Sequence, residues 1–155
     1  MKHNFIAAID PGPTKSSMVC YDPVTGRVIT KNIADNTCLL SLIKCADTSI
    51  PLAIEMIASY GMPVGAETFE TCVWIGRFIQ AWQGPHTLVY RKDVKLHLCG
   101  SLRAKDANVR QALIDLYGGK TAVGTKKKPG PLYGIKSHSW SALAVAVTWA
   151  QSQKL

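Results

Sequence analysis

Long hydrophobic runs are missing from this sequence of 155 residues. The longest apolar stretch, Ala142 to Ala150, is interrupted by Thr148, whereas a membrane-spanning helix needs about 20 apolar residues. The apolar run behind the N-terminus, Phe5 to Ile9, is shorter than the core of a signal peptide. We therefore expect neither a membrane protein nor a secreted one.

Paired cysteines are also missing, and charged residues are few. The five cysteines are odd in number and none has C-x-x-C spacing, which argues against a disulfide framework and a zinc site. We expect them to be small core residues of a cytoplasmic protein, where thiols stay reduced. Hydrophobic residues at 47% against charged ones at 18% exclude intrinsic disorder, and the length suits one domain over residues 1–155.

Acidic residues are scarce, and the resulting positive charge lies in one segment. The sequence has 18 Lys and Arg against 10 Asp and Glu, a net charge of +8, and residues 91–136 carry eleven basic side chains against three acidic ones. Such a concentration indicates a polyanionic partner, most often nucleic acid, although a solvated face is the simpler alternative. Within it, residues 118–136 have no periodicity and contain Lys126, Lys127 and Lys128 among glycines and prolines. We predict a flexible basic loop there that contacts a phosphate backbone.

The hydrophobic pattern predicts strands that alternate with helices. Expected strands are residues 5–9, 17–21, 27–30, 51–57 and 87–90. One expected helix begins at Asn36 or Thr37, and three others cover residues 66–82, 105–117 and 137–151. Three strands in a meander followed by alternating strands and helices imply an α/β fold, with a mixed sheet covered by helices. The apolar stripe of helix 66–82 offers a surface for dimerisation.

Two acids follow or interrupt apolar strands. Asp10 ends the first strand in an Asp-Pro-Gly turn, and Glu55 stands inside the apolar run Ala53 to Ile57. If the first and fourth strands are parallel neighbours, both carboxylates emerge at one edge and can share Mg²⁺ ions, which prefer oxygen ligands. The simpler alternatives are that Asp10 bonds the local backbone and that Glu55 forms a buried ion pair with a basic residue.

Three motifs in order resemble those of the RuvC-type Holliday-junction resolvases. They are Ile9-Asp10-Pro11-Gly12, Ala53-Ile54-Glu55, and a final helix that starts His138-Ser139-Trp140-Ser141-Ala142-Leu143-Ala144. The resemblance covers nearly the whole chain and implies a ribonuclease-H-like fold with a five-stranded sheet in the order 3-2-1-4-5. It also implies a homodimer that cuts branched DNA, with Mg²⁺ (or Mn²⁺) activating water for attack on a phosphodiester.

Carried over by position, the resemblance assigns catalytic and metal-binding roles to Asp10, Glu55 and His138. The family's last helix begins with Asp or His and has Asp three residues later, but Ser141 stands at that second position. A hydroxyl is a poorer metal ligand than a carboxylate, and three interpretations follow. His138 suffices, or Asp106 supplies the missing charge as a further catalytic residue, or the chain binds branched DNA without cutting it.

The family also uses lysines near the scissile phosphate. Lys105 is the best match for this role, while Lys92, Lys95 and Arg103, like the lysines of the loop, are expected to contact flanking phosphates. An alternative of another class is an actin-like or sugar-kinase-like nucleotide-binding domain, because residues 9–15 also resemble the first phosphate loop of those proteins. They bind nucleotide between two such domains, and this sequence provides only one.

Overall fold

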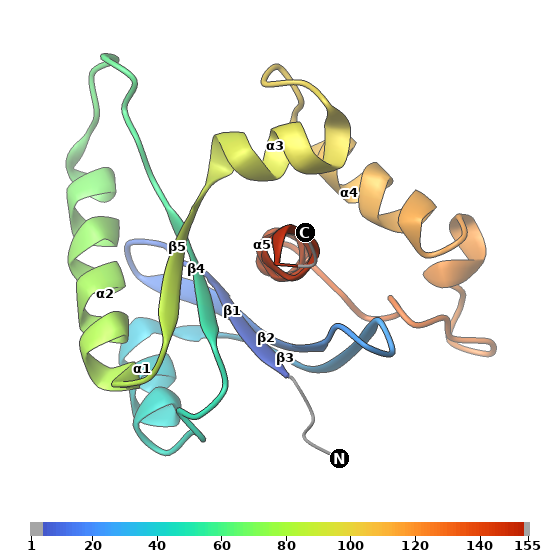
Figure 1. The fold of residues 1–155 in the computed structure, drawn as a ribbon, viewed down its shortest axis with the longest axis horizontal. Helices are drawn as coiled ribbons and strands as arrows, with labels where there is room; N and C mark the ends of the chain where they lie inside the picture. Colours follow the sequence, from blue (N-terminus) through green and yellow to red (C-terminus); the bar gives the residue numbers. More distant parts are fainter. Residues whose placement is uncertain (1–4, 154–155) are drawn as a thin grey trace.

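The structure is a computed structural model that describes residues 5–153. Its centre is one five-stranded sheet (Figure 1). The strands are β1 (Ile6–Asp10), β2 (Lys15–Asp22), β3 (Arg27–Asp35), β4 (Leu52–Met56) and β5 (His86–Tyr90). Their order is β3-β2-β1-β4-β5, with β1, β2 and β3 antiparallel and with β1, β4 and β5 parallel. The predicted mixed sheet and its order 3-2-1-4-5 are confirmed.

Helices cover both faces of this sheet. They are α1 (Asn36–Lys44), α2 (Ala66–Trp82), α3 (Arg91–Cys99), α4 (Asp106–Leu116), the 3-10 helix η1 (Lys120–Ala122) and α5 (Ser139–Ser152). Figure 1 shows α1 and α2 on one side of the sheet and α5 on the other, with α3 and α4 packed beyond α5. The two layers have separate hydrophobic cores.

The alternation of side chains along the strands decides which layer each residue meets. The core beneath α1 and α2 receives Ala7, Ile9, Leu52 and Ile54. Ala8 and Ala53 point the other way and pack in the core around α5. Because side chains alternate with a period of two, Asp10 shares the face of Ala8, and Glu55 shares the face of Ala53. Both carboxylates therefore lie on the α5 side of the sheet.

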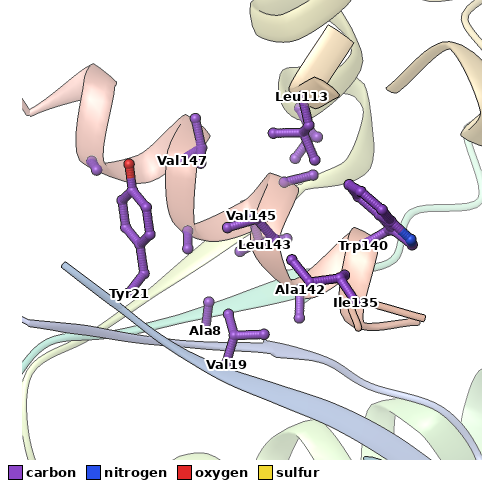
Figure 2. Packing of buried hydrophobic residues seen from close by; sticks show 14 of the residues in the cluster. Ala8, Val19, Tyr21, Leu113, Ile135, Trp140, Ala142, Leu143, Val145 and Val147 are labelled. Atoms are coloured by element: carbon purple, nitrogen blue, oxygen red, sulfur yellow. The ribbon is translucent and has the colours of Figure 1, made fainter. Parts of the chain in front are cut away.

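Helix α5 is the central element of that side. It is apolar almost all round, as expected for a helix surrounded by protein. Leu143 and Val145 lie over Ala8 and Val19 of the sheet (Figure 2), and α3 and α4 pack against its other sides. This packing fixes the start of α5, which carries His138 and Ser141, relative to the ends of β1 and β4.

The structure also contains features that the pattern did not predict. Helix α3 was missed, because only Val94 among its nine residues is buried and the rest of its sequence is largely polar. Strand β3 is longer than expected, since it is an edge strand with mostly exposed side chains and no apolar signature.

The expectation that the cysteines lie in the core was wrong. Cys38 and Cys45 are exposed, and the other three are half-buried. The buried face of α1 runs through Leu39 and Ile43, so Cys38 lies beside it and Cys45 lies beyond the end of the helix. All five are free thiols.

The basic segment 118–136 is anchored at both ends. Ala122, Leu132 and Ile135 are buried in the α5 core. Between them, Gly124 forms an isolated β-bridge with Pro129 and has a φ of +67°. A Cβ atom on Gly124 would lie 2.3 Å from the carbonyl oxygen of Lys128, so this position favours glycine. The three consecutive lysines form the exposed turn inside this bridge. The flexibility of that turn stays a prediction.

No helix within residues 5–153 is long and apolar enough to cross a membrane.

Candidate active site

Asp10 and Glu55 lie side by side at the carboxyl ends of two neighbouring strands. Asp10 is the last residue of β1, and β1 pairs in parallel with β4 so that Ile9 stands opposite Ile54. The next residue on each strand is the acid, and paired strands are about 4.8 Å apart. Both residues are buried. The two carboxylates therefore lie on neighbouring strands at the same end of the sheet, as predicted.

The surroundings of this pair disfavour two full negative charges. Burial, together with the neighbouring carboxylate of Asp10, raises the pKa of Glu55 to about 7, although Arg91 opposes the shift. Burial also raises the pKa of Asp10 above its ordinary value, while the contact with His138 lowers it. A cation held between these carboxylates would favour their charged forms.

His138 contacts the first of these acids. Its Nδ1 atom lies 3.0 Å from Oδ2 of Asp10, and its side chain is 69% exposed. A carboxylate accepts hydrogen bonds, so the Nδ1 atom donates, and the Nε2 atom remains for another partner. The next residue, Ser139, is fixed to β2 by a hydrogen bond of 2.9 Å between its hydroxyl and that of Ser17. The sheet therefore holds the start of α5 at the end of β1.

Arg91 contacts the second acid. Its Nη1 atom donates to Oε1 of Glu55 at 3.1 Å, and its other terminal nitrogen contacts Asp106 at the start of α4. Glu55 thus has the buried ion pair that was the alternative to a metal-binding role. We did not predict Arg91 as a site residue, although its position follows from the topology. Since β5 pairs in parallel with β4 and Val89 stands opposite Glu55, Arg91 lies two residues further along on the same side of the sheet.

An open cleft of about 380 Å³ lies between the end of the sheet, α3, α4 and α5, and Asp10 lies behind its lining, in contact with His138. Of the predicted residues, the lining contains Glu55, Lys95, Asp106, His138 and Ser141. Ser141 therefore faces the cleft. It stands at the position where the family resemblance predicts an Asp. The lining also includes Arg110, which we did not single out for this role and whose guanidinium lies 4.8 Å from the ring centre of Trp140.

The other predicted DNA contacts lie outside this lining. Lys105 precedes Asp106 and is exposed, as are Arg103 and the lysines 126–128. Lys92 is exposed and lies 5.6 Å from the ring centre of Tyr60, in a second hollow beside the cleft that is also lined by Arg91 and Lys95. Their contacts with DNA stay predictions.

The donor set fits a hard divalent cation only in part. Asp10 and Glu55 offer carboxylate oxygens, which Mg²⁺ and Mn²⁺ prefer. Within residues 5–153, however, no group of three or more His, Cys, Asp or Glu side chains is arranged to hold a metal ion. Asp106 instead contacts Arg91, and His138 contacts Asp10. The two carboxylates are thus the residues that fit the metal, and His138 supports one of them.

The turn after Asp10 is closed by its own hydrogen bonds. The Gly12 amide donates to Oγ of Ser16 at 3.1 Å, and Nδ2 of Asn36 donates to the Gly12 carbonyl at 2.9 Å. The Ser16 hydroxyl donates in turn to Oδ1 of Asn36 at 2.6 Å. This network holds Asp10 in place and already uses the Gly12 amide, which a phosphate loop would leave free for its ligand. It gives no support to the nucleotide-binding alternative.

The sheet order 3-2-1-4-5, with helices on both faces, is that of a RuvC-like, ribonuclease-H-like α/β fold. Two solved structures of RuvC from Thermus thermophilus have the same fold. One is 18% identical, with a TM-score of 0.64, and the match covers 97% of this chain and 96% of that one. The other, a complex with a Holliday junction substrate, is 17% identical with a TM-score of 0.66 and covers 98% and 96%. No protein-family model matches the sequence, and no curated protein matches it.

Proposed function

We propose that the protein is a metal-dependent, structure-selective endonuclease that cleaves phosphodiesters in branched DNA such as Holliday junctions. The observation that carries this proposal is the pair of buried carboxylates, Asp10 and Glu55, at neighbouring strand ends beside an open cleft. The RuvC-type fold supports it, since one solved structure with this fold is a complex with a Holliday junction substrate.

The acids and their neighbours have distinct roles in this proposal. Asp10 and Glu55 would hold Mg²⁺ or Mn²⁺, and the metal would supply activation of water and stabilisation of charge for hydrolysis of the phosphodiester. His138 orients Asp10 through its Nδ1 atom. Lys95 and Arg110, which line the cleft, neutralise the phosphate that enters it.

DNA outside the cleft is held by the remaining basic residues. Lys92, Arg103, Lys105 and the lysines 126–128 are exposed and free to contact flanking phosphates. Contacts of this kind provide affinity and register rather than base recognition, which suits an enzyme that selects the shape of its substrate. A homodimer would present two such sites to two strands of one junction.

A second candidate is a protein that binds branched DNA without cutting it. Two observations favour it. Ser141 faces the cleft where an acid is expected, and Glu55 is already paired with Arg91. In this case the basic surface retains its role, and the acids serve only the packing of the sheet edge.

A cleavage assay separates the two candidates. A four-way junction, a flap, a fork and a linear duplex of the same sequence are incubated with the protein in Mg²⁺, in Mn²⁺ and in EDTA. We expect cleavage of branched substrates in either metal and none in EDTA. Tight junction binding without cleavage would favour the second candidate, and equal cleavage of the linear duplex would contradict selectivity for structure.

A further inference from the structure

The positive side chain of Arg91 already contacts Glu55, the carboxylate that holds a metal in the proposed function. Arg91, the first residue of α3, places Nη1 3.1 Å from Oε1 of Glu55 and also contacts Asp106. Its guanidinium has five donors in a planar fork, so it can bridge two carboxylates on opposite sides of the cleft. The chain thus contains its own counter-ion at this position.

The two partners of Arg91 differ in their contact with water. The Glu55 side chain is 9% exposed and the Asp106 side chain is 75% exposed. Water screens the pair with Asp106, whereas the pair with Glu55 compensates a charge that is costly to bury. Arg91 therefore matters most to Glu55 when nothing else neutralises that acid.

The guanidinium also has room to move. Arg91 is 41% exposed and lines both the cleft and the neighbouring hollow of about 470 Å³, which also contains Tyr60 and Leu102. It can therefore leave Glu55 without displacing buried residues, while the exposed carboxylate of Asp106 remains available to hold it.

We propose that Arg91 is a resident counter-ion that competes with a divalent cation for Glu55, and that Asp106 retains the guanidinium when it leaves. The inference rests on the proposed function, in which Glu55 holds the metal. A divalent ion and a guanidinium on one carboxylate repel each other, so the ion binds only as Arg91 withdraws. Arg91 thereby lowers the metal affinity of the free protein, and Asp106 is a positioning residue that acts through Arg91.

Binding of Mn²⁺ to the full chain without DNA tests this competition. Free Mn²⁺ is followed by electron paramagnetic resonance at one fixed pH. We expect Arg91→Gln to bind Mn²⁺ about tenfold more tightly than the wild type, within the usual range of coupling between sites. The control is Arg110→Gln, which removes a charge from the same cleft but not an ion pair with either acid. Its affinity should change by less than about threefold, because the Arg110 side chain is exposed and its charge is screened by water.

A double-mutant cycle tests the role of Asp106. In the wild-type background, Asp106→Asn should weaken Mn²⁺ binding, because the guanidinium then has Glu55 as its remaining carboxylate partner. In the Arg91→Gln background, the same substitution should have little effect. Equal weakening in both backgrounds would show that Asp106 acts on the metal directly and would overturn this part of the proposal.

Two further variants separate this inference from the proposed function. Glu55→Gln should abolish the tight Mn²⁺ site; if it does not, the metal site of the proposed function is wrong, and the competition fails with it. If Glu55→Gln abolishes binding but Arg91→Gln leaves the affinity unchanged or weaker, only the competition is wrong. Should Arg91→Gln fail to fold, Arg91→Lys decides the question. Lysine lacks the two-pronged fork, so we expect tighter binding than in the wild type, and unchanged or weaker binding overturns the proposal.

Discussion

At Ser141 the cleft has a hydroxyl group, whereas the family resemblance predicts a carboxylate there. This residue faces the cleft one helical turn after His138. A carboxylate there would add negative charge and a metal ligand. We therefore expect Ser141→Asp to tighten Mn²⁺ binding at least about fivefold. The control Ser152→Asp adds the same charge at the exposed end of α5 and should have no such effect. Equal affinities of the two variants would contradict a metal near Ser141.

His138 provides a second test at the level of single residues. Removing its hydrogen bond to Asp10 leaves that carboxylate less well oriented, and the loss of such a partner typically costs about 10–100-fold in activity. We expect His138→Ala to slow junction cleavage by this factor while junction binding persists. His97→Ala is the matched control, because that imidazole instead bonds Gln151 near the C-terminal end of α5. Similar rates for both variants would remove His138 from the site.

The acids of the site could be predicted from the sequence, but their cation partner could not. Glu55 interrupts an apolar strand, and such a charge needs a partner or a ligand. Arg91 carries no comparable signal, because a basic residue at the start of an exposed helix is ordinary. Its role depends on the parallel pairing of β4 with β5, which is a property of the sheet rather than of the local sequence.

The same limit applies to whole elements. Apart from Asp10 and Glu55, strands β1 and β4 are apolar because both of their faces are covered, and this pattern can be recognised in the sequence. Helix α3 is short, largely polar and buries only Val94, and strand β3 forms an exposed edge, so the apolar signal of both in the sequence is weak. The exposed position of Cys38 likewise depends on which face of α1 meets α2, and Cys45 lies beyond the end of that helix.

The turn that carries Lys126, Lys127 and Lys128 is an element with a predicted electrostatic role. Each phosphate contact contributes about 0.9 to the slope of log affinity against log salt concentration on duplex DNA. Replacing all three lysines with Ala should flatten this slope for junction binding, by up to about 2.7 if every lysine contacts a phosphate. Lys15→Ala with Lys44→Ala removes exposed lysines from elsewhere and should leave the slope almost unchanged. An unaltered slope in the triple variant would refute the contact.

For the molecule as a whole, we predict a homodimer that presents two sites to one junction. Phe69 and Val73 are exposed on α2, whose buried face runs through Ile75, Phe78 and Trp82. We expect light scattering to give the mass of a dimer, and we expect Phe69→Glu with Val73→Glu to give a monomer. Glu70→Gln on the same exposed helix is the control and should remain dimeric. A monomeric wild type would contradict the expected homodimer.

The proposed activity is metal-dependent cleavage of branched DNA by two buried acids at neighbouring strand ends. Its most direct test is single-turnover cleavage of a synthetic four-way junction in Mg²⁺, together with the junction affinity of each protein. We expect Asp10→Asn and Glu55→Gln to bind the junction and to lose cleavage, because an amide is a poor ligand for a hard cation. Asp115→Asn, an exposed acid of α4 that bonds Gln111, should cut like the wild type. If both site variants cut the junction as fast as the wild type, the assignment of the site is wrong.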